Sequence, residues 1–117
     1  MSFSMTTAAI KRRAKTVTRR FGWSFLKPGD QVRAVEKSMG LKKGEKVVQL
    51  AVLEVVSNTP EPLRRMMDLA SYGRKEVVLE GFPDLSPSAF VKMLCTHYRV
   101  TPDVLVNRIE FRYVEEA

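Results

Sequence analysis

The chain has 117 residues, of which 44% are hydrophobic and 28% are charged, a composition that excludes a disordered segment and predicts one globular domain over residues 1–117. No run approaches the roughly 18 consecutive apolar residues of a membrane span, so we expect no membrane partner and a cytoplasmic protein. The net charge of +7 is uneven: residues 1–50 hold twelve Lys/Arg and three acids, a charge of +9, whereas residues 51–117 hold eight and ten, a charge of −2.

The first half of the chain alternates short helical and extended patterns. Residues 6–13 predict a short helix capped by Thr6 or Thr7 with Ile10 facing inward, and residues 15–21 predict an extended segment. Lys27-Pro28-Gly29-Asp30 is typical of a turn, because proline fixes one φ and glycine supplies conformational freedom. The alternation of Val32, Ala34 and Glu36 then predicts a strand.

A Gly- and Lys-rich turn over residues 39–46 precedes the longest β-prone run, residues 47–56, which we expect to be the central strand. Residues 60–69 predict a helix, with Pro60 near its first turn. The strongest helix signal lies at 86–97, where an N-cap serine, a proline at the first position and an apolar stripe agree. The last strand is predicted over residues 104–114.

Together these patterns predict an α+β domain without βαβ units. We expect a small, barrel-like mixed β-sheet of about five strands flanked by about three helices. Residues 76–79 are ambiguous, because Glu76-Val77-Val78-Leu79 has the residue types of a strand.

Three segments favour a functional explanation over a purely structural one. They are the basic segment Lys15-Thr16-Val17-Thr18-Arg19-Arg20, the Lys27–Asp30 turn and Glu80-Gly81-Phe82-Pro83. Six of the ten residues from Lys11 to Arg20 are basic, a density typical of proteins that bind polyphosphate or another polyanion. A membrane surface is a weaker alternative, because the segment lacks a large apolar face.

In this order the motifs resemble the ASCH domain of the PUA-like superfamily. The match comprises Lys-Thr-x-Thr-Arg-Arg at 15–20, Lys-Pro-Gly-Asp at 27–30, Glu-Gly-Phe at 80–82 and the final strand Arg-Ile-Glu-Phe at 108–111. The resemblance covers most of the chain and implies a barrel-like sheet with a cleft lined by the basic segment and the carboxylate. It also implies that residues 76–79 are helical, so that Glu76 and Glu80 share a face and Glu76 supports or replaces Glu80.

The resemblance implies RNA-related roles. Some members resemble PUA domains that bind RNA, and one branch consists of amidohydrolases that deacetylate N4-acetylcytidine with a Lys, a Thr three residues later and a distant Glu. By motif position these are Lys15, Thr18 and Glu80. Arg19-Arg20-Phe21-Gly22-Trp23 and the Lys-rich Leu41–Gly44 turn are unlike that branch.

The chemistry of this trio is reasonable, although the sequence leaves its roles open. A threonine hydroxyl needs a base or a cation that favours its alkoxide, which Glu80 and Lys15 can supply; alternatively Lys15 is the base, if burial lowers its pKa. Arg19 or Arg20 can stabilise an oxyanion or hold a phosphate, and Trp23 or Phe21 can stack on a base.

Three functions remain open from the sequence. The first is an RNA- or nucleotide-binding module in which Lys15, Arg19, Arg20, Trp23, Lys42 and Lys43 contact the nucleic acid. The second is an amidohydrolase acting on a modified nucleoside with Lys15, Thr18 and Glu80 as reactive groups. The third is a basic protein-interaction domain whose charges keep it soluble.

Other reactive residues carry less information. The single cysteine, Cys95, excludes an internal disulfide and a cysteine-based zinc cluster, and we expect it in the core of a helix. The single histidine, His97, is predicted to lie on a core-facing stripe. Neither a Gly-rich phosphate loop nor a His/Asp/Glu cluster at ligand spacing is present, so we expect neither a cofactor nor a metal.

Overall fold

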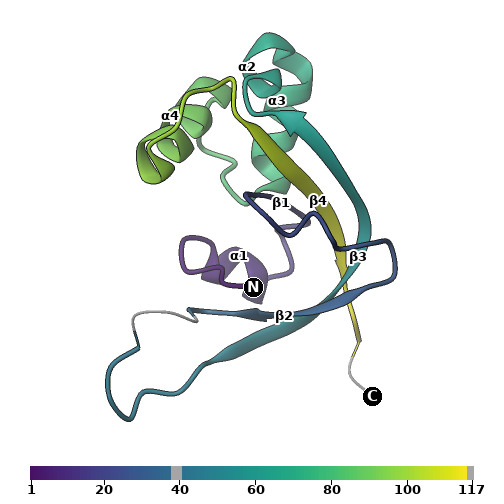
Figure 1. Cartoon of the computed structure of the whole chain (residues 1–117), viewed down its shortest axis with the longest axis vertical. Helices are drawn as coiled ribbons and strands as arrows, with labels where there is room; N and C mark the ends of the chain where they lie inside the picture. The colour runs from purple at the N-terminus through teal and green to yellow at the C-terminus, as the bar shows by residue number, and fades with distance from the viewer. Residues whose placement is uncertain (38–40, 116–117) are drawn as a thin grey trace.

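The computed structural model describes residues 1–37 and 41–115. In this part of the chain a four-stranded sheet is accompanied by four helices (Figure 1). The strands are β1 (Val17–Arg20), β2 (Gln31–Val35), β3 (Gln49–Pro62) and β4 (Leu105–Tyr113), and the helices are α1 (Thr7–Lys11), α2 (Arg65–Asp68), α3 (Ala70–Leu79) and α4 (Pro87–Tyr98).

The sheet has the order β1-β4-β3-β2, and all its neighbouring strands are antiparallel. The α+β class is therefore confirmed. The expectation of a barrel-like mixed sheet of about five strands with about three helices is wrong for the described residues, which form an antiparallel sheet of four strands without barrel closure, together with four helices. The N-terminal segment occupies the place beside β2 where a fifth strand would pair. The Val35 carbonyl accepts a hydrogen bond from the Phe3 amide (2.8 Å), and the Val35 amide donates one to the Met1 carbonyl (2.9 Å). The N-terminal segment makes one parallel bridge there, between Ser2 and Val35, before it turns into α1.

Strand β3 is longer than the sequence predicts, and the helix expected over residues 60–69 is wrong in its first part. Pro60 and Pro62 belong to β3 and face Asn107 and Leu105 of β4. Beyond Glu54, β3 has no β2 partner in the described residues, so this edge of the strand is open. Pro60 and Pro62 are alternate residues, so their backbone nitrogens, which lack a hydrogen, both face the open edge, where the sheet requires no donor. The helix α2 begins only at Arg65.

The other elements agree with the sequence more closely. Ser86 caps α4 by accepting a hydrogen bond from the Ala89 amide at 3.1 Å, and residues 76–79 are helical as the resemblance implies. The turn at 27–30 is closed by the Asp30 amide donating to the Lys27 carbonyl at 2.9 Å. Of the turn predicted over 39–46, residues 39 and 40 lie outside the described residues.

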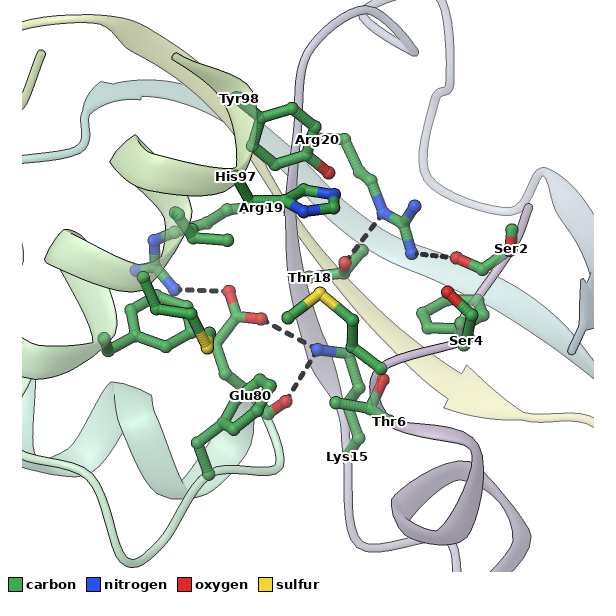
Figure 2. Close-up of a pocket in the computed structure, with 16 residues that line it drawn as sticks. Ser2, Ser4, Thr6, Lys15, Thr18, Arg19, Arg20, Glu80, His97 and Tyr98 are labelled. Atoms are coloured by element: carbon green, nitrogen blue, oxygen red, sulfur yellow. Dashed lines mark hydrogen bonds and ion pairs between the residues drawn. The ribbon is translucent and has the colours of Figure 1, made fainter. Parts of the chain in front are cut away.

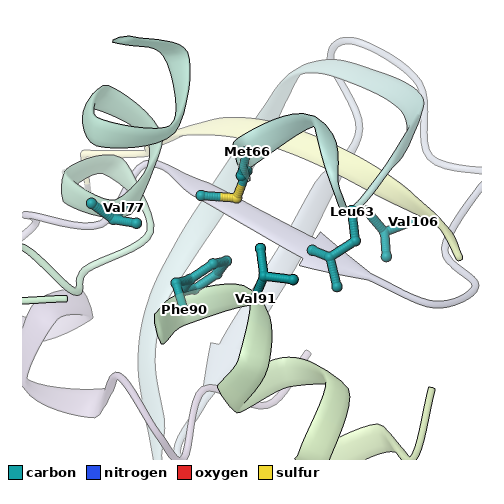
Figure 3. Close-up of a cluster of buried hydrophobic side chains, with 6 residues drawn as sticks. All are labelled: Leu63, Met66, Val77, Phe90, Val91 and Val106. Carbon is teal, nitrogen blue, oxygen red and sulfur yellow. The ribbon is translucent and has the colours of Figure 1, made fainter. Parts of the chain in front are cut away.

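The apolar core is divided between the helical end of the molecule and the sheet. Figure 3 shows the first cluster, where α2, α3, α4 and β4 meet; it consists of Leu63, Met66, Val77, Phe90, Val91 and Val106. Cys95 packs against it but is only partly buried, so the expectation of a core position is met in part. A second cluster packs the N-terminal segment and α1 on the sheet and contains Phe3, Ile10, Ala34, Leu53 and Phe111. The described part of the chain holds no helix long and apolar enough to cross a membrane.

Candidate functional site

A cavity of about 470 Å³ lies between the two parts of the core. Its lining comes from four places in the chain: the N-terminal segment 2–6, the segment 15–20 that contains β1, residues 80 and 82 after α3, and one face of α4. Figure 2 shows that side chains from these elements converge on one space. Lys15, Thr18, Arg19, Arg20 and Glu80, all selected from the sequence, are among them.

The centre of the site is a buried ion pair between Lys15 and Glu80. The Lys15 Nζ donates to Glu80 Oε1 at 2.8 Å and to the Glu80 backbone carbonyl at 2.6 Å, and both side chains are less than 5% exposed. Burial lowers the pKa of the Lys15 ammonium, although the charge of Glu80 and its hydrogen bond act in the opposite direction. Within the part of the chain that the structure describes, Lys15 therefore has one N–H left for a ligand.

The backbone after α3 explains how Glu80 reaches Lys15. Glu80 is the C-cap of α3, and Gly81 follows with a φ of +91°, the left-handed conformation that ends many helices. A Cβ at Gly81 would lie 3.0 Å from the Ala9 Cβ and 3.5 Å from the Lys15 Cβ. Glycine thus allows the end of α3 to approach α1 and Lys15, which is the physical basis of the Glu-Gly pair in the sequence.

Arg19 connects Glu80 to the rest of a buried ion network. Its guanidinium donates to Glu80 (2.9 Å), Glu61 (3.0 Å) and Glu76 (2.6 Å), and its side chain is 0% exposed. Burial by itself lowers the pKa of Arg19, but the three carboxylates outweigh it and raise that pKa further above its ordinary value. Arg19 is therefore a permanent cation that fixes Glu80 rather than a free phosphate ligand.

Glu76 is held on its other side by Arg108 of β4, which donates two hydrogen bonds to it, at 2.6 and 3.0 Å. Burial raises the pKa of Glu76, but the hydrogen bonds from Arg108 and Arg19 outweigh this effect and lower it. Tyr72 donates to Glu61 at 2.7 Å, and burial together with this bond raises the pKa of Tyr72 to about 12. The arginines therefore favour the charged form of Glu76, and Tyr72 keeps the proton that it donates to Glu61.

Thr18 and Arg20 project together on the other side of β1. The Arg20 Nε donates to Thr18 Oγ1 at 2.9 Å, and its Nη2 donates to the Ser2 carbonyl at 2.6 Å. Among the described residues the Thr18 hydroxyl has no hydrogen bond with Lys15 or Glu80, so its polar contact is to a cation rather than to a base. Burial lowers the pKa of Arg20, and its guanidinium lies 4.6 Å from the centre of the Phe3 ring.

The opposite wall is apolar and aromatic, and α4 supplies much of it. Phe90 is buried, and its ring centre lies 5.6 Å from that of Phe82 in the α3–α4 connection. The expectation that His97 faces the core is wrong, because His97 is exposed and lines the cavity. Next to it Tyr98 makes an edge contact with Phe21, which follows β1, at 4.9 Å. This wall is suited to a planar or apolar ligand.

The other residues selected from the sequence lie outside the cavity lining. Trp23 packs beside the cluster of Leu26, Val55 and Ile109 and lies 5.7 Å from the Phe25 ring. Lys42 and Lys43 are exposed in the connection between β2 and β3, which Figure 1 shows at the opposite end of the molecule from α4. Any contact they make with a ligand of the cavity therefore requires a ligand that extends beyond it.

Sequence reasoning missed part of the site. It did not select the N-terminal segment 2–6, which forms one side of the cavity, or Glu61 and Tyr72 of the ion network, and it named Arg108 only as part of the motif of the last strand. One available signal was the opposite charge of the two halves, because the acidic half supplies all three carboxylates that bind Arg19. Within the described residues no group of three or more His, Cys, Asp or Glu side chains has the arrangement of a metal site.

Comparison with known proteins supports the fold through structure alone. No family model and no curated protein matches the sequence. A protein from Enterococcus faecalis V583, described by the family name DUF984, superposes with a TM-score of 0.60 at 15% identity, over 95% of this chain and 68% of that one. An ASCH domain from Lactobacillus crispatus JV V101 superposes with a TM-score of 0.51 at 13% identity, over 93% of this chain and 70% of that one. The chain therefore has an ASCH-like fold.

Proposed function

We propose that the cavity binds a nucleobase-bearing ligand, either one nucleotide unit of an RNA or a modified nucleoside. The observation that carries this proposal is the pairing of an apolar, aromatic wall with a wall of hydrogen-bond donors from β1 and the segment before it. A volume of about 470 Å³ lies within the range of small-molecule sites. A nucleobase can stack on the apolar, aromatic wall, and the keto oxygens and phosphate of a nucleotide can accept hydrogen bonds from the donors of the other wall.

The ion network also limits the kind of nucleic-acid contact. Lys15 and Arg19, two of the six basic residues in 11–20, are neutralised inside the protein by Glu61, Glu76 and Glu80. They do not release counterions from a phosphate backbone as free cations do. We therefore expect recognition of a single nucleotide with about one or two phosphate contacts, so that log K changes with log salt by a slope of roughly −0.7 to −1.4 for a single strand.

The test is calorimetric titration with a panel of nucleosides and short single-stranded RNAs at several salt concentrations. Ser4 is exposed and lines the cavity, so Ser4→Trp fills the space without changing the core. Ser71→Trp on the exposed side of α3 is the matched control. Binding that is lost in the first variant and kept in the second supports the proposal. Absence of binding by every ligand at low salt contradicts it.

A second candidate is hydrolysis of an acylated nucleoside such as N4-acetylcytidine. It is favoured by the presence of Lys15, Glu80 and Thr18 in one cavity, with a lysine whose pKa is lowered by burial. In this mechanism the Thr18 oxygen attacks the acetyl carbonyl, the C–N bond breaks, and the proton lost by the Thr18 hydroxyl passes to the released amine. Water then hydrolyses the acetyl–Thr18 ester to acetic acid and restores the hydroxyl. Arg20, which donates to Thr18, favours the alkoxide form of that hydroxyl.

The enzymatic candidate is tested by incubating the protein with N4-acetylcytidine and following cytidine by liquid chromatography and mass spectrometry. Thr18→Val and Glu80→Gln should each abolish turnover if the trio is catalytic. Turnover that persists unchanged in both variants removes these residues from the mechanism. Tight binding without turnover leaves the binding function in place.

A further inference from the structure

Arg20 differs from the other cations of the site in its partners. Lys15, Arg19 and Arg108 each contact at least one carboxylate. Arg20 forms no ion pair within the described residues, and both of its hydrogen bonds go to neutral oxygens, the Thr18 hydroxyl and the Ser2 carbonyl. A partly buried guanidinium that lines a cavity without a counter-charge is energetically unfavourable unless a ligand supplies one.

The free donors around Arg20 point to the same kind of ligand. Within the described residues the Arg20 Nη1 has no hydrogen-bond partner, and Thr18 Oγ1 accepts from Arg20 Nε, which leaves its own proton free to donate. Lys15 retains one N–H. Both carboxylate oxygens of Glu80 already accept hydrogen bonds, from Lys15 and from Arg19. The polar wall therefore offers donors and one cation, which suit an anion rich in acceptors.

The charges of the site show how large that anion should be. Among the described side chains that are buried or half-buried, four cations line the cavity or the network behind it, Lys15, Arg19, Arg20 and Arg108, and the network contains the three carboxylates of Glu61, Glu76 and Glu80. Arg65 also approaches Glu61, at 4.0 Å, but its side chain is 46% exposed, so water screens its charge and it is left out of this balance. One positive charge is left over. A ligand with one negative charge completes the balance, whereas a second negative charge would exceed it in a partly buried site, where an uncompensated charge is costly.

We propose that the cavity selects a ligand with a single negative charge, held by the Arg20 guanidinium and the Thr18 hydroxyl, and that this charge is a phosphodiester. The inference rests on the proposed function, since it specifies the phosphate state of the bound nucleotide. A phosphodiester carries one charge, whereas a phosphate monoester carries about −1.5 to −2 at neutral pH and a nucleoside carries none. The favoured ligand is therefore a nucleotide within a chain or a diester of one.

The experiment compares three probes with the same base: the nucleoside, its 5′-monophosphate and the methyl ester of that phosphate, titrated at pH 8 and low salt. The methyl ester should bind at least about tenfold more tightly than the nucleoside, because it adds a charge-assisted hydrogen bond. It should also bind more tightly than the monophosphate. Dimethyl phosphate, which carries the charge without the nucleoside, should bind far more weakly than the methyl ester.

Variants identify the residue responsible. Arg20→Gln should remove the preference for the methyl ester while the nucleoside still binds, and Arg20→Lys should keep part of it, because lysine preserves the charge without the forked donors. Arg74→Gln, an exposed arginine of α3, is the matched control and should change nothing. Thr18→Val is the second test of the same site if Arg20→Gln does not fold. It should lower the affinity for the methyl ester more than the affinity for the nucleoside.

The outcomes separate this inference from the proposed function. Equal affinity for the nucleoside and the methyl ester, or a preference for the monophosphate, overturns the single-charge inference and leaves nucleobase binding in place. Dimethyl phosphate that binds as tightly as the methyl ester overturns nucleobase recognition and the inference that rests on it, because the site would then recognise an anion alone. If none of the nucleoside probes binds, the proposed function fails and the inference fails with it.

Discussion

Replacing Glu76 by glutamine tests whether the buried ion network holds the site together. Glu76 is 1% exposed and accepts three hydrogen bonds, one from Arg19 and two from Arg108. Glutamine keeps the shape but removes the charge, and its amide NH₂ faces an arginine N–H where an oxygen had accepted. The variant leaves the Lys15–Glu80 pair intact, so it probes the support of the site separately from its reactive groups.

The expected cost follows from the partners that remain. Breaking a buried ion pair by removing one member typically costs about 3–5 kcal/mol. Arg19 retains Glu61 and Glu80, and the Arg108 side chain is 17% exposed and can be hydrated, so we expect the lower end, about 3 kcal/mol. For a chain of this size that corresponds to a fall in Tm of about 12 °C.

The assay is urea unfolding followed by circular dichroism, with exposed Glu36→Gln as control, which should stay within about 0.5 kcal/mol of the wild type. The pH dependence adds a second check. The folded-state pKa of Glu76 is lowered, so its contribution is present above the ordinary glutamate pKa and is lost as pH falls through the lowered value. A loss below about 1 kcal/mol, or a difference between wild type and variant that does not shrink in acid, would refute the reasoning.

Three further predictions concern packing, capping and ligand binding. Gly73→Ala should destabilise the protein by about 2 kcal/mol in urea unfolding, because the new Cβ would lie 2.0 Å from the Met66 carbonyl oxygen; a gain in stability would contradict this. Ser86→Ala should lower the stability by about 1 kcal/mol and Ser86→Asp should not, since the side chain caps α4. The affinity for the methyl ester of the nucleoside 5′-monophosphate should fall as pH rises through the lowered pKa of Lys15, because the site loses a positive charge. In calorimetric titrations over the same range, the affinity of Lys15→Met for this ester should depend less on pH.

Local sequence signals predicted most of the elements. The serine, proline and apolar stripe at 86–97 predicted both ends of α4 to within about one residue, because capping and periodicity are short-range signals. Residues 60–69 were mispredicted because Pro60 is compatible both with a helix start and with a strand edge. Which one forms depends on the pairing with β4, and a local pattern does not contain that information.

The candidate site shows the same division. Lys15, Thr18 and Glu80 were selected by motif, and the structure does bring them to one cavity. Arg19 and Arg20 are adjacent residues of the same type. Arg19 is neutralised by three carboxylates, whereas Arg20 binds only neutral oxygens among the described residues. In a strand, neighbouring side chains point to opposite faces, and what each face meets is set by distant segments.

The sequence alone determined the α+β class, the basic first half and the residue types available for chemistry, because these depend on composition and short-range periodicity. The tertiary structure decided the number of strands, the position of His97 in the cavity and which of the basic side chains are neutralised by carboxylates. The acidic half of the chain supplies the carboxylates that neutralise Arg19 and Lys15. Charge pairing between residues 42 to 65 positions apart is fixed only when β1, β3 and α3 pack together, since no local rule relates those residues.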